Sequence, residues 1–397
     1  MSIWTKKGSS ILKDGVPQFL AGVAYAPTPC GAATFEPGVG DWFSKPWNAI
    51  WERDFPLMKA AGINNIRTYF FWAWTPPRNM RDWQSVVSQP PAFDHQPFLD
   101  AAQAYGISVT IGIALDGGNV FDNGTAELGE DYFNFYKATA VKLAQLYGKH
   151  EAVMGFCIGN EQNNEKRIIR DDFWEKLKEM ADEVRGAAAQ KLVMFAMQND
   201  NPNMFTAVSK PSGKPVPKCF AEAFDVWGIN IYSGMSETLA NYKSHVVNNP
   251  ETQLPLIISE WGIAGGKNVP EGAAGPPDGQ ATARELTPEE FQTRINKLMI
   301  PDMETMQNNL DFVAGSQFFE WTDEWWKNEH TDVWEQNASA SPDWPEEFWG
   351  LNSIAPNGRT AKDGPWNVNA NQPYPADILK ARPTLSALTN FYNQVKK

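Results

Sequence analysis

Short apolar segments that alternate with longer stretches of helical period constrain this chain more than any other feature of its sequence. We identify eight such segments, each rich in β-branched and aromatic residues, at 19–26, 65–71, 108–115, 153–159, 192–197, 226–232, 256–259 and 316–321. Strands that alternate with helices are typical of βα units and a parallel sheet, and eight parallel strands can close into a barrel. An open doubly wound sheet is the alternative, but no glycine-rich phosphate-binding loop follows the first segment.

The sequence therefore predicts an α/β protein with one (β/α)₈ barrel, a TIM barrel, as a single domain over residues 1–397. Residues 1–18 are expected to form a hairpin cap at the barrel floor, because Asp14-Gly15 suits a tight turn. Residues 322–380 are expected to form an extended loop after the eighth strand. Residues 383–397 follow the pattern of a closing amphipathic helix.

Tryptophan is abundant, with 17 residues, and many of them lie in loops that follow predicted strands. All such loops share the C-terminal face of a barrel, where active sites lie, and aromatic rings there suit the flat apolar faces of sugars. We expect Trp72 and Trp74 to contact substrate. The full set comprises Trp42 and Trp47 after the first strand, Trp72, Trp74 and Trp83 after the second, and Trp325, Trp326, Trp334, Trp344 and Trp349 after the eighth.

The charge balance excludes two classes of partner. With 34 basic and 47 acidic residues the net charge is −13, which argues against nucleic acid or an anionic membrane surface. No run of 18 apolar residues is present, so no segment is expected to span a bilayer. The N-terminus lacks the apolar core of a secretion signal. A secreted chain whose signal had been removed would look the same, so the location stays open between the cytoplasm and the exterior.

No metal or other cofactor is expected. The four histidines, His95, His150, His245 and His330, show no HxH or HExxH spacing. An acidic loop over 116–131 is rich enough in oxygen for calcium but fits no EF-hand pattern, so a solvated loop is favoured. The three cysteines, Cys30, Cys157 and Cys219, are too few and too scattered for a disulfide framework.

Two glutamates stand where apolar strands give way to loops. Glu161 follows the fourth strand and Glu260 follows the seventh, so both are expected at the rim of one face. Glycoside hydrolysis needs such a pair, about 5–5.5 Å apart for retention of configuration and about 6.5–9.5 Å apart for inversion. Ordinary rim glutamates are the alternative. Asp323 and Glu324 are weaker candidates, because their register beyond the eighth strand takes them out of the barrel mouth.

The neighbours of these glutamates carry a family resemblance. Gly159-Asn160-Glu161 and Ser259-Glu260-Trp261-Gly262 resemble the paired signatures of clan A glycoside hydrolases. Residues 53–59, Gly62 and 65–69 are similar to the stretch before and within the second strand of that clan. Within the clan, these segments are most similar to the β-1,3-glucanosyltransferases of fungal cell walls. The resemblance runs from about Phe19 to Trp321. Those transferases carry disulfides and a membrane-anchored secretory context, neither of which is visible in this sequence.

The resemblance implies a role for each matched residue. Glu161 would be the acid/base and Glu260 the nucleophile. The residues implied to surround them are Asn160 on the sugar 2-hydroxyl, Arg67 beside Glu260, Tyr232 as a hydrogen-bond donor to Glu260, and Trp321 as the floor of subsite −1. From the residues alone, Arg67 could equally be a buried ion-pair partner and Trp321 a core residue.

Together these inferences predict a retaining glycoside hydrolase that cleaves a β-linked glycan by double displacement through a covalent glycosyl-enzyme. The resemblance around the second strand favours a β-glucan as the substrate. A β-mannan, a β-galactan or an aryl β-glycoside stays open as an alternative substrate. A transglycosidase with the same residues is one alternative. A catalytically inactive carbohydrate-binding barrel is another. The expected partner is an oligo- or polysaccharide, and the sequence leaves the oligomeric state open.

Overall fold

A computed structural model provides the three-dimensional structure. It describes residues 2–30, 42–69, 71, 74, 76–122, 126–201, 203–269, 282–324, 346–358 and 375–396. Trp72, Trp325, Trp326, Trp334, Trp344 and His330 therefore lie outside the described residues, as does most of the predicted loop over 322–380.

Eight parallel strands close into a barrel, as predicted from the sequence. In ring order they are β4 (Leu20–Ala24), β5 (Asn65–Arg67), β6 (Ser108–Ile113), β7 (Val153–Asn160), β8 (Leu192–Gln198), β9 (Val226–Asn230), β10 (Leu256–Trp261) and β13 (Val313–Phe318). The ring closes where β13 pairs with β4, with Gly315 opposite Leu20 and Phe318 opposite Val23. All eight predicted segments correspond to these strands, which confirms the (β/α)₈ fold class.

Several strand ends differ from the sequence prediction by one to four residues, and two of these differences lie at the strands that carry Arg67 and Glu260. Strand β5 stops at Arg67 rather than at residue 71, because the Thr68 hydroxyl accepts the hydrogen bond from the Gly112 N–H at 3.0 Å in place of a strand carbonyl. Strand β10 continues beyond residue 259 to Trp261, and after register shifts Glu260 pairs with Asn230 of β9. Glu260 thus lies within a strand rather than in the loop that follows it.

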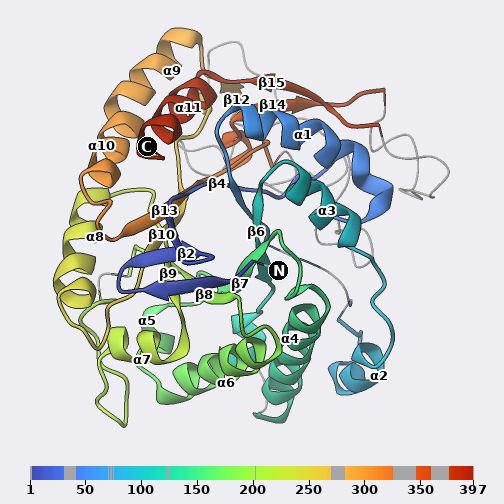
Figure 1. The fold of residues 1–397 in the computed structure, drawn as a ribbon, viewed down its shortest axis with the longest axis vertical. Coiled ribbons are helices and arrows are strands. Elements are labelled where there is room, and N and C mark those ends of the chain that lie inside the picture. Colours follow the sequence, from blue (N-terminus) through green and yellow to red (C-terminus); the bar gives the residue numbers. More distant parts are fainter. Residues whose placement is uncertain are drawn as a thin grey trace.

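The helices form an outer ring around the barrel (Figure 1). They are α1 (Asn48–Ala60), α2 (Trp83–Val87), α3 (Gln96–Ala104), α4 (Ala126–Tyr147), α5 (Glu165–Ile168), α6 (Asp171–Ala187), α7 (Val216–Ala223), α8 (Met235–Tyr242), α9 (Pro288–Arg294), α10 (Ile300–Gln307) and α11 (Pro383–Val395). Short 3₁₀ or π segments are η1 (Lys45–Trp47), η2 (Met80–Asp82), η3 (Gly118–Asp122), η4 (Lys243–Val247), η5 (Ile295–Met299) and η6 (Glu346–Phe348). Helix α9 begins at a capping box in which the Thr287 hydroxyl accepts from the Glu290 N–H and the Glu290 carboxylate accepts from the Thr287 N–H.

An antiparallel sheet of β1 (Trp4–Lys7), β2 (Ser10–Lys13) and β3 (Val16–Gln18) lies across the middle of the barrel in Figure 1. The Trp4 N–H donates to the carbonyl of Gln190, which precedes β8, at 2.9 Å. Trp4 and Ile11 pack against side chains inside the barrel, among them Met154 and Leu192. Because these contacts lie at the N-terminal ends of the strands, the sheet covers the barrel floor and leaves the opposite face to the loops.

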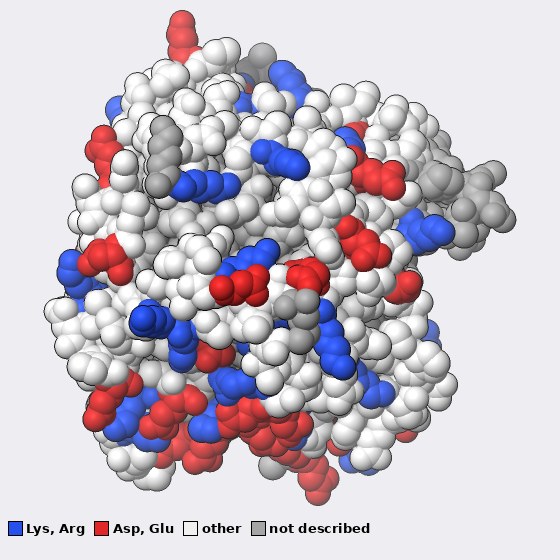
Figure 2. All heavy atoms as spheres, in the orientation of Figure 1, with Lys and Arg blue, Asp and Glu red and all other residues white. Residues whose placement is uncertain are grey.

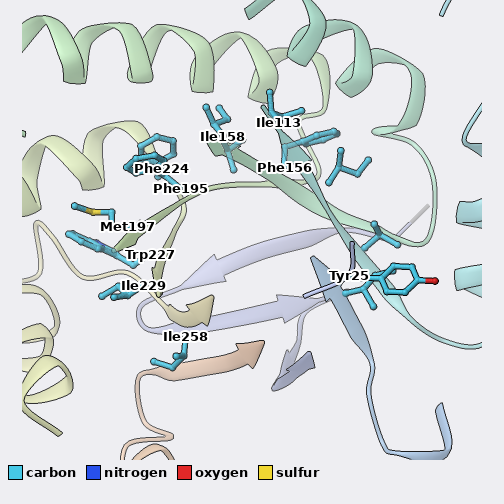
Figure 3. Packing of buried hydrophobic residues seen from close by; sticks show 14 of the residues in the cluster. Tyr25, Ile113, Phe156, Ile158, Phe195, Met197, Phe224, Trp227, Ile229 and Ile258 are labelled. Carbon is cyan, nitrogen blue, oxygen red and sulfur yellow. The ribbon is translucent and has the colours of Figure 1, made fainter. Parts of the chain in front are cut away.

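Side chains of the barrel strands alternate between two apolar cores. On β8, Leu192, Met194 and Ala196 belong to the cluster inside the barrel, whereas Val193, Phe195 and Met197 belong to the larger cluster between strands and helices. Figure 3 shows Phe195 beside Phe224, and their rings stack with centroids 5.6 Å apart. The same alternation takes Asn65 and then Arg67 of β5 into the barrel and places Arg67 at its upper end.

The seam between the first and last barrel strands is locked by helix α11. The Tyr392 hydroxyl donates to the Gly22 carbonyl of β4 at 2.6 Å and lies 3.0 Å from the Ser316 carbonyl of β13. Two hairpins lie beyond the barrel, β11 (Gly266–Val269) with β12 (Thr282–Glu285), and β14 (Asn352–Ala355) with β15 (Ile378–Ala381). Just before α11, Arg382 pairs with the buried carboxylate of Asp323.

The close approach of β5 and β6 yields a stability prediction. A Cβ on Gly112 would lie 2.0 Å from the Thr68 carbonyl oxygen, so Gly112→Ala is expected to lower the free energy of unfolding by about 2–3 kcal/mol. Gly186 in α6 has open space around the same position, so Gly186→Ala is expected to raise it by about 0.5–1 kcal/mol. Urea denaturation followed by circular dichroism measures both. Equal midpoints for the two variants would contradict the close packing.

Acidic and basic side chains mix on the face shown in Figure 2, most densely at its lower edge over α6. Within α6, Lys178 and Arg185 both pair with Asp182. Such exposed pairs contribute little to stability, about 0–1 kcal/mol each. Among the described helices, none combines the length and apolar character needed to cross a membrane.

Candidate active site

Both predicted glutamates lie at the C-terminal end of the barrel. Glu161 directly follows β7 and has a left-handed backbone with φ of 55°, and its N–H donates to the Ala196 carbonyl at 2.8 Å. Of the non-glycine residues described, Asp14 alone shares a positive φ, and it occupies the hairpin turn. A left-handed non-glycine residue costs about 1–3 kcal/mol, and such strain concentrates at functional sites.

Three donors surround the buried carboxylate of Glu260. The Tyr69 hydroxyl donates to Oε1 and the Tyr232 hydroxyl to Oε2, each at 2.7 Å, while Arg67 Nη1 lies 3.3 Å from Oε1. Burial, and then the Glu260 charge, raise the pKa of both tyrosines well above its ordinary value, so both remain protonated donors. These contacts fix the orientation of both carboxylate oxygens.

A chain of side-chain amides links Glu260 to Glu161. Arg67 Nη2 donates to Asn160 at 2.5 Å, and because a guanidinium can only donate, the Asn160 atom that faces it is Oδ1. Asn230 Nδ2 donates to the same Oδ1 at 3.1 Å and to Glu161 Oε1 at 2.9 Å. The Ser259 hydroxyl donates to Asn230 Oδ1 at 2.7 Å, which fixes that amide too. Asn160 Nδ2 donates to no described residue.

The surroundings of Glu161 favour its protonated form. Burial contributes most to raising the pKa of Glu161, and the negative charge of Glu260 raises it further. The hydrogen bond from Asn230 and the charge of Arg67 act in the opposite direction but do not outweigh these causes. Because Arg67, Asn160 and Asn230 link Glu260 to Glu161 through hydrogen bonds, the two carboxyl groups share one site. A carboxyl group that keeps its proton toward neutral pH can serve as a general acid.

A third carboxylate, that of Asp200, also raises the pKa of Glu161. Asp200 is exposed in the loop after β8. That loop is held against the segment after Glu161, because Asn163 accepts from the Gln198 N–H at 2.9 Å and donates to the Gln198 carbonyl at 3.0 Å.

Asp200→Asn is therefore expected to lower the pKa of Glu161. Activity that needs the protonated acid is lost as pH rises through that pKa, so the basic limb of the kcat/KM profile should move to lower pH. Glu175→Gln, on an exposed position of α6, is the matched control and should leave the profile in place. A basic limb that moved up, or equally in both variants, would count against the Asp200 effect.

The structure brings Arg67, Asn160, Tyr232, Glu161 and Glu260 together. Of the predicted tryptophans, Trp349 lies beside this group, with its ring centroid 4.9 Å from that of Tyr232. Trp321 is fully buried. Trp74 is also buried, and its indole N–H donates to the Gln89 carbonyl at 3.0 Å. Trp72 lies outside the described residues. Contact of these three rings with a sugar stays a prediction.

The sequence did not predict four residues that the structure places at the site: Tyr69, Asn230, Ser259 and Phe319. Tyr69 lies two residues after Arg67, and Asn230 lies two residues before Tyr232. Side chains two residues apart on a strand point to the same face, so this spacing could have placed both residues beside their predicted neighbours. The Phe319 ring lies 6.2 Å from each of the Tyr69 and Tyr232 rings, centroid to centroid. Phe319 thus lies beside both tyrosines that hold Glu260, and it also lies 6.2 Å from the Trp349 ring, centroid to centroid.

A cavity of about 240 Å³ opens beside this constellation, between the upper ends of β5, β6 and β7. Its lining is Arg67, Thr68, Tyr69, Gly112, Ile113, Ala114, Leu115, Cys157, Gly159, Asn160 and Gln162. Within the described part of the chain, no group of three or more His, Cys, Asp or Glu side chains could hold a metal ion. The three cysteines are free and buried.

Solved glycosidases share this fold. A β-glucuronidase from Ruminococcus gnavus matches with a TM-score of 0.60 at 13% identity, covering 99% of this chain and 53% of that one. A GH2 β-galacturonidase from Eisenbergiella tayi gives 0.57 at 13%, covering 99% and 54%. A β-D-glucuronidase from Dictyoglomus thermophilum gives 0.54 at 14%, covering 99% and 54%. The chain thus spans about half the length of these proteins, and at this identity the likeness establishes the fold.

No family model and no curated protein matches the sequence.

Proposed function

We propose that this chain is a retaining glycoside hydrolase that cleaves a β-linked glycan, with Glu260 as nucleophile and Glu161 as acid/base. One observation carries the proposal: two carboxyl groups share one site in opposite surroundings. Glu260 accepts three hydrogen bonds from fixed donors. Glu161 is held toward its protonated form by burial and by the Glu260 charge. Paired acids whose surroundings differ in this way are typical of an assigned acid and an assigned nucleophile.

The first step forms the glycosyl-enzyme. A Glu260 oxygen attacks the anomeric carbon while the Glu161 proton passes to the glycosidic oxygen, so the C–O bond breaks and the leaving group departs as an alcohol. The sugar is then held as an ester of Glu260. Esterification removes the Glu260 charge, which is one of the causes that raise the pKa of Glu161. Glu161 can then act as a base at the same pH.

The second step releases the sugar. Ionised Glu161 takes a proton from water, the water oxygen attacks the anomeric carbon, and Glu260 leaves as a carboxylate. Two inversions give net retention. The donors Tyr69, Tyr232 and Arg67 again receive the carboxylate as it forms, so they support both the entry and the departure of the nucleophile.

For the substrate we propose a neutral β-glucan unit. The second-strand resemblance favours it, whereas the structural neighbours named above are glycosidases of uronic acids. A uronic acid brings a carboxylate that needs a cationic partner. Among the described residues of the cavity wall, Arg67 is the cation, and it already contacts the Ser259 carbonyl, Glu260 and Asn160. Because Arg67 already has these partners, the cavity wall offers no further cation for a sugar carboxylate, which supports a neutral sugar.

Transfer of the sugar to another glycan is the second candidate, since the same residues serve it. It rests on the resemblance to β-1,3-glucanosyltransferases, and none of the three structural neighbours above is named a transferase. A catalytically inactive binding barrel would need neither the left-handed backbone at Glu161 nor the raised pKa of that carboxyl.

The test is a panel of aryl β-glycosides, comprising glucoside, mannoside, galactoside and glucuronide, with proton NMR reading the anomer that forms first. The proposal expects the β-anomer first and the highest kcat/KM on the glucoside. First appearance of the α-anomer would refute double displacement. Products longer than a laminari-oligosaccharide substrate would favour transfer over hydrolysis.

A further inference from the structure

Glu161 lies in a turn that its two sequence neighbours close. Gln162 Nε2 donates to the Asn160 carbonyl at 2.7 Å, so the residue after Glu161 bonds back to the residue before it. The turn encloses the left-handed backbone of Glu161, a conformation that is costly for a residue with a side chain. A group that fixes the Gln162 amide therefore also helps to fix the direction of the Glu161 carboxyl group.

Arg167 holds Gln162 by both its side chain and its main chain. Arg167 Nη1 donates to Gln162 Oε1 at 2.8 Å and to the Gln162 carbonyl at 3.3 Å. Because a guanidinium can only donate, Oε1 must face Arg167, and Nε2 is then left to face the Asn160 carbonyl. The Arg167 side chain is buried, so solvent competes little for these hydrogen bonds.

Arg167 is itself held by Asp122, which ends η3 in the segment after β6. Arg167 Nε donates to Asp122 Oδ2 at 2.9 Å, and Nη2 contacts the same oxygen. The hydrogen bond from Arg167, and then its charge, lower the pKa of Asp122, so the aspartate is an ionised partner. The planar guanidinium reaches Asp122 and Gln162 at once, which the single ammonium group of a lysine would not do.

The residues that follow this turn are held without the Arg167 side chain. Asn201, in the segment after β8, donates from Nδ2 to the Asn163 carbonyl at 2.9 Å. Asn164 caps α5, because its side chain accepts from the main-chain N–H of Arg167 at 3.0 Å. A substitution of the Arg167 side chain should therefore loosen the turn around Glu161 and leave α5 in place.

We propose that Arg167 is a positioning residue for the general acid and acts on Glu161 through Gln162. The inference rests on the proposed function and deepens it, because it extends control of the acid to the segment after β6. Proton transfer needs the acid within hydrogen-bond reach of the glycosidic oxygen, so a small turn of the Glu161 carboxyl group weakens it. Attack by Glu260 should change little, because the donors that hold its carboxylate come from the ends of β5 and β9.

The acidity of the leaving group separates a misplaced acid from a general loss of structure. The substrates are the dinitrophenyl and methoxyphenyl glycosides of the sugar that the wild-type protein cleaves fastest. Arg167→Lys keeps a positive charge beside Asp122 and should lower kcat/KM about tenfold or more on the methoxyphenyl glycoside, whose leaving group needs a proton. On the dinitrophenyl glycoside, whose leaving group needs none, the loss should be less than about threefold. Equal losses on both substrates, or no loss on either, would overturn the proposal.

A double-mutant cycle tests the route through Gln162. Gln162→Ala alone should show the same selective loss on the methoxyphenyl glycoside. If Arg167 acts through Gln162, adding Arg167→Lys to this variant should lower kcat/KM by less than about twofold further. Losses that multiply in the double variant would show that Arg167 acts by another route, and they would overturn the assignment.

Gly117→Ala disturbs the same contact without removing either partner. A Cβ on Gly117 would overlap Gln162 Oε1 and crowd Arg167 Nη1, and both atoms lie at the ends of flexible side chains that can move aside. The variant is therefore expected to fold and to lose activity selectively on the methoxyphenyl glycoside. An unchanged ratio of the two kcat/KM values would contradict the proposal.

Arg170→Lys is the matched control. Arg170 also reaches η3, where its Nη1 donates to the Phe121 carbonyl at 3.0 Å, and it also pairs with an aspartate, Asp172. Both glycosides should keep wild-type kcat/KM within about twofold in this variant, and the same selective loss as in Arg167→Lys would contradict a specific role of Arg167. Thermal unfolding checks that each variant folds.

The two proposals fail separately. If the wild-type protein cleaves no aryl β-glycoside, the proposed function fails. If it cleaves one and Glu161→Ala shows the loss of a general acid, but Arg167→Lys does not distinguish the two leaving groups, the role of Arg167 fails alone.

Discussion

Glu260→Ala is expected to abolish the proposed turnover, lowering kcat/KM on an activated aryl glycoside roughly 10⁴-fold or more, while the fold survives. The loss is large because no other described group stands where the attacking oxygen must be, held by Tyr69, Tyr232 and Arg67. Arg67 retains its bonds to the Ser259 carbonyl at 2.8 Å and to Asn160 at 2.5 Å, so the removed carboxylate does not leave the guanidinium without partners. Steady-state kinetics measure the loss of activity, and near-ultraviolet circular dichroism shows whether the fold survives.

A chemical control accompanies this variant. Azide can enter the space left by the Glu260 side chain and attack the anomeric carbon directly, which would give a glycosyl azide of inverted configuration. Glu165→Ala, an exposed glutamate in α5, is the matched substitution and should keep wild-type activity. If Glu260→Ala kept even about a tenth of wild-type kcat, the nucleophile would have to be another residue.

Glu161→Ala separates the two chemical steps. A leaving group as acidic as dinitrophenol needs no proton, so the first step is spared and a burst of phenol is expected. The second step lacks its base and becomes rate-limiting. For substrates with poor leaving groups, kcat/KM is expected to fall about 10²–10⁴-fold, the usual contribution of general acid catalysis.

Azide distinguishes this variant from the previous one. It attacks the glycosyl-enzyme without needing a base, so it should restore turnover of the dinitrophenyl glycoside and give a glycosyl azide of retained configuration. The basic limb of the pH profile should also disappear, because it reports the Glu161 proton. Failure to see both the azide product and the flattened profile would place the acid elsewhere.

The sequence was sufficient to predict the repeating βα units of the barrel. The alternation of apolar segments and helical stretches predicted all eight barrel strands. The strand-end positions of Glu161 and Glu260 predicted that both lie at the C-terminal end of the barrel, where the structure places them. Arg67, Asn160 and Tyr232 followed from a family resemblance, and the structure brings them to the same site. Their catalytic roles are proposals that the experiments above address.

What the sequence did not provide depends on contacts between distant segments. Asn230 matters because its amide reaches Glu161 and Asn160, and no local pattern marks that reach. The end of β10 was misplaced because register shifts against β9 and β13 keep Glu260 inside the strand. Phe319 was not predicted, because the fold rather than a local sequence pattern sets which side chain just after β13 faces Tyr69 and Tyr232.

The hydroxyl of Tyr392 bridges the seam between β4 and β13. During synthesis β4 leaves the ribosome long before β13, and α11 emerges later still. The nascent chain can assemble its inner strands early, but the edge of β4 stays open to other partners until β13 is released to pair with it, and Tyr392 then bridges the two strands. Premature termination before β13 would therefore leave the edges of β4 and β10 unprotected, and such edges promote aggregation.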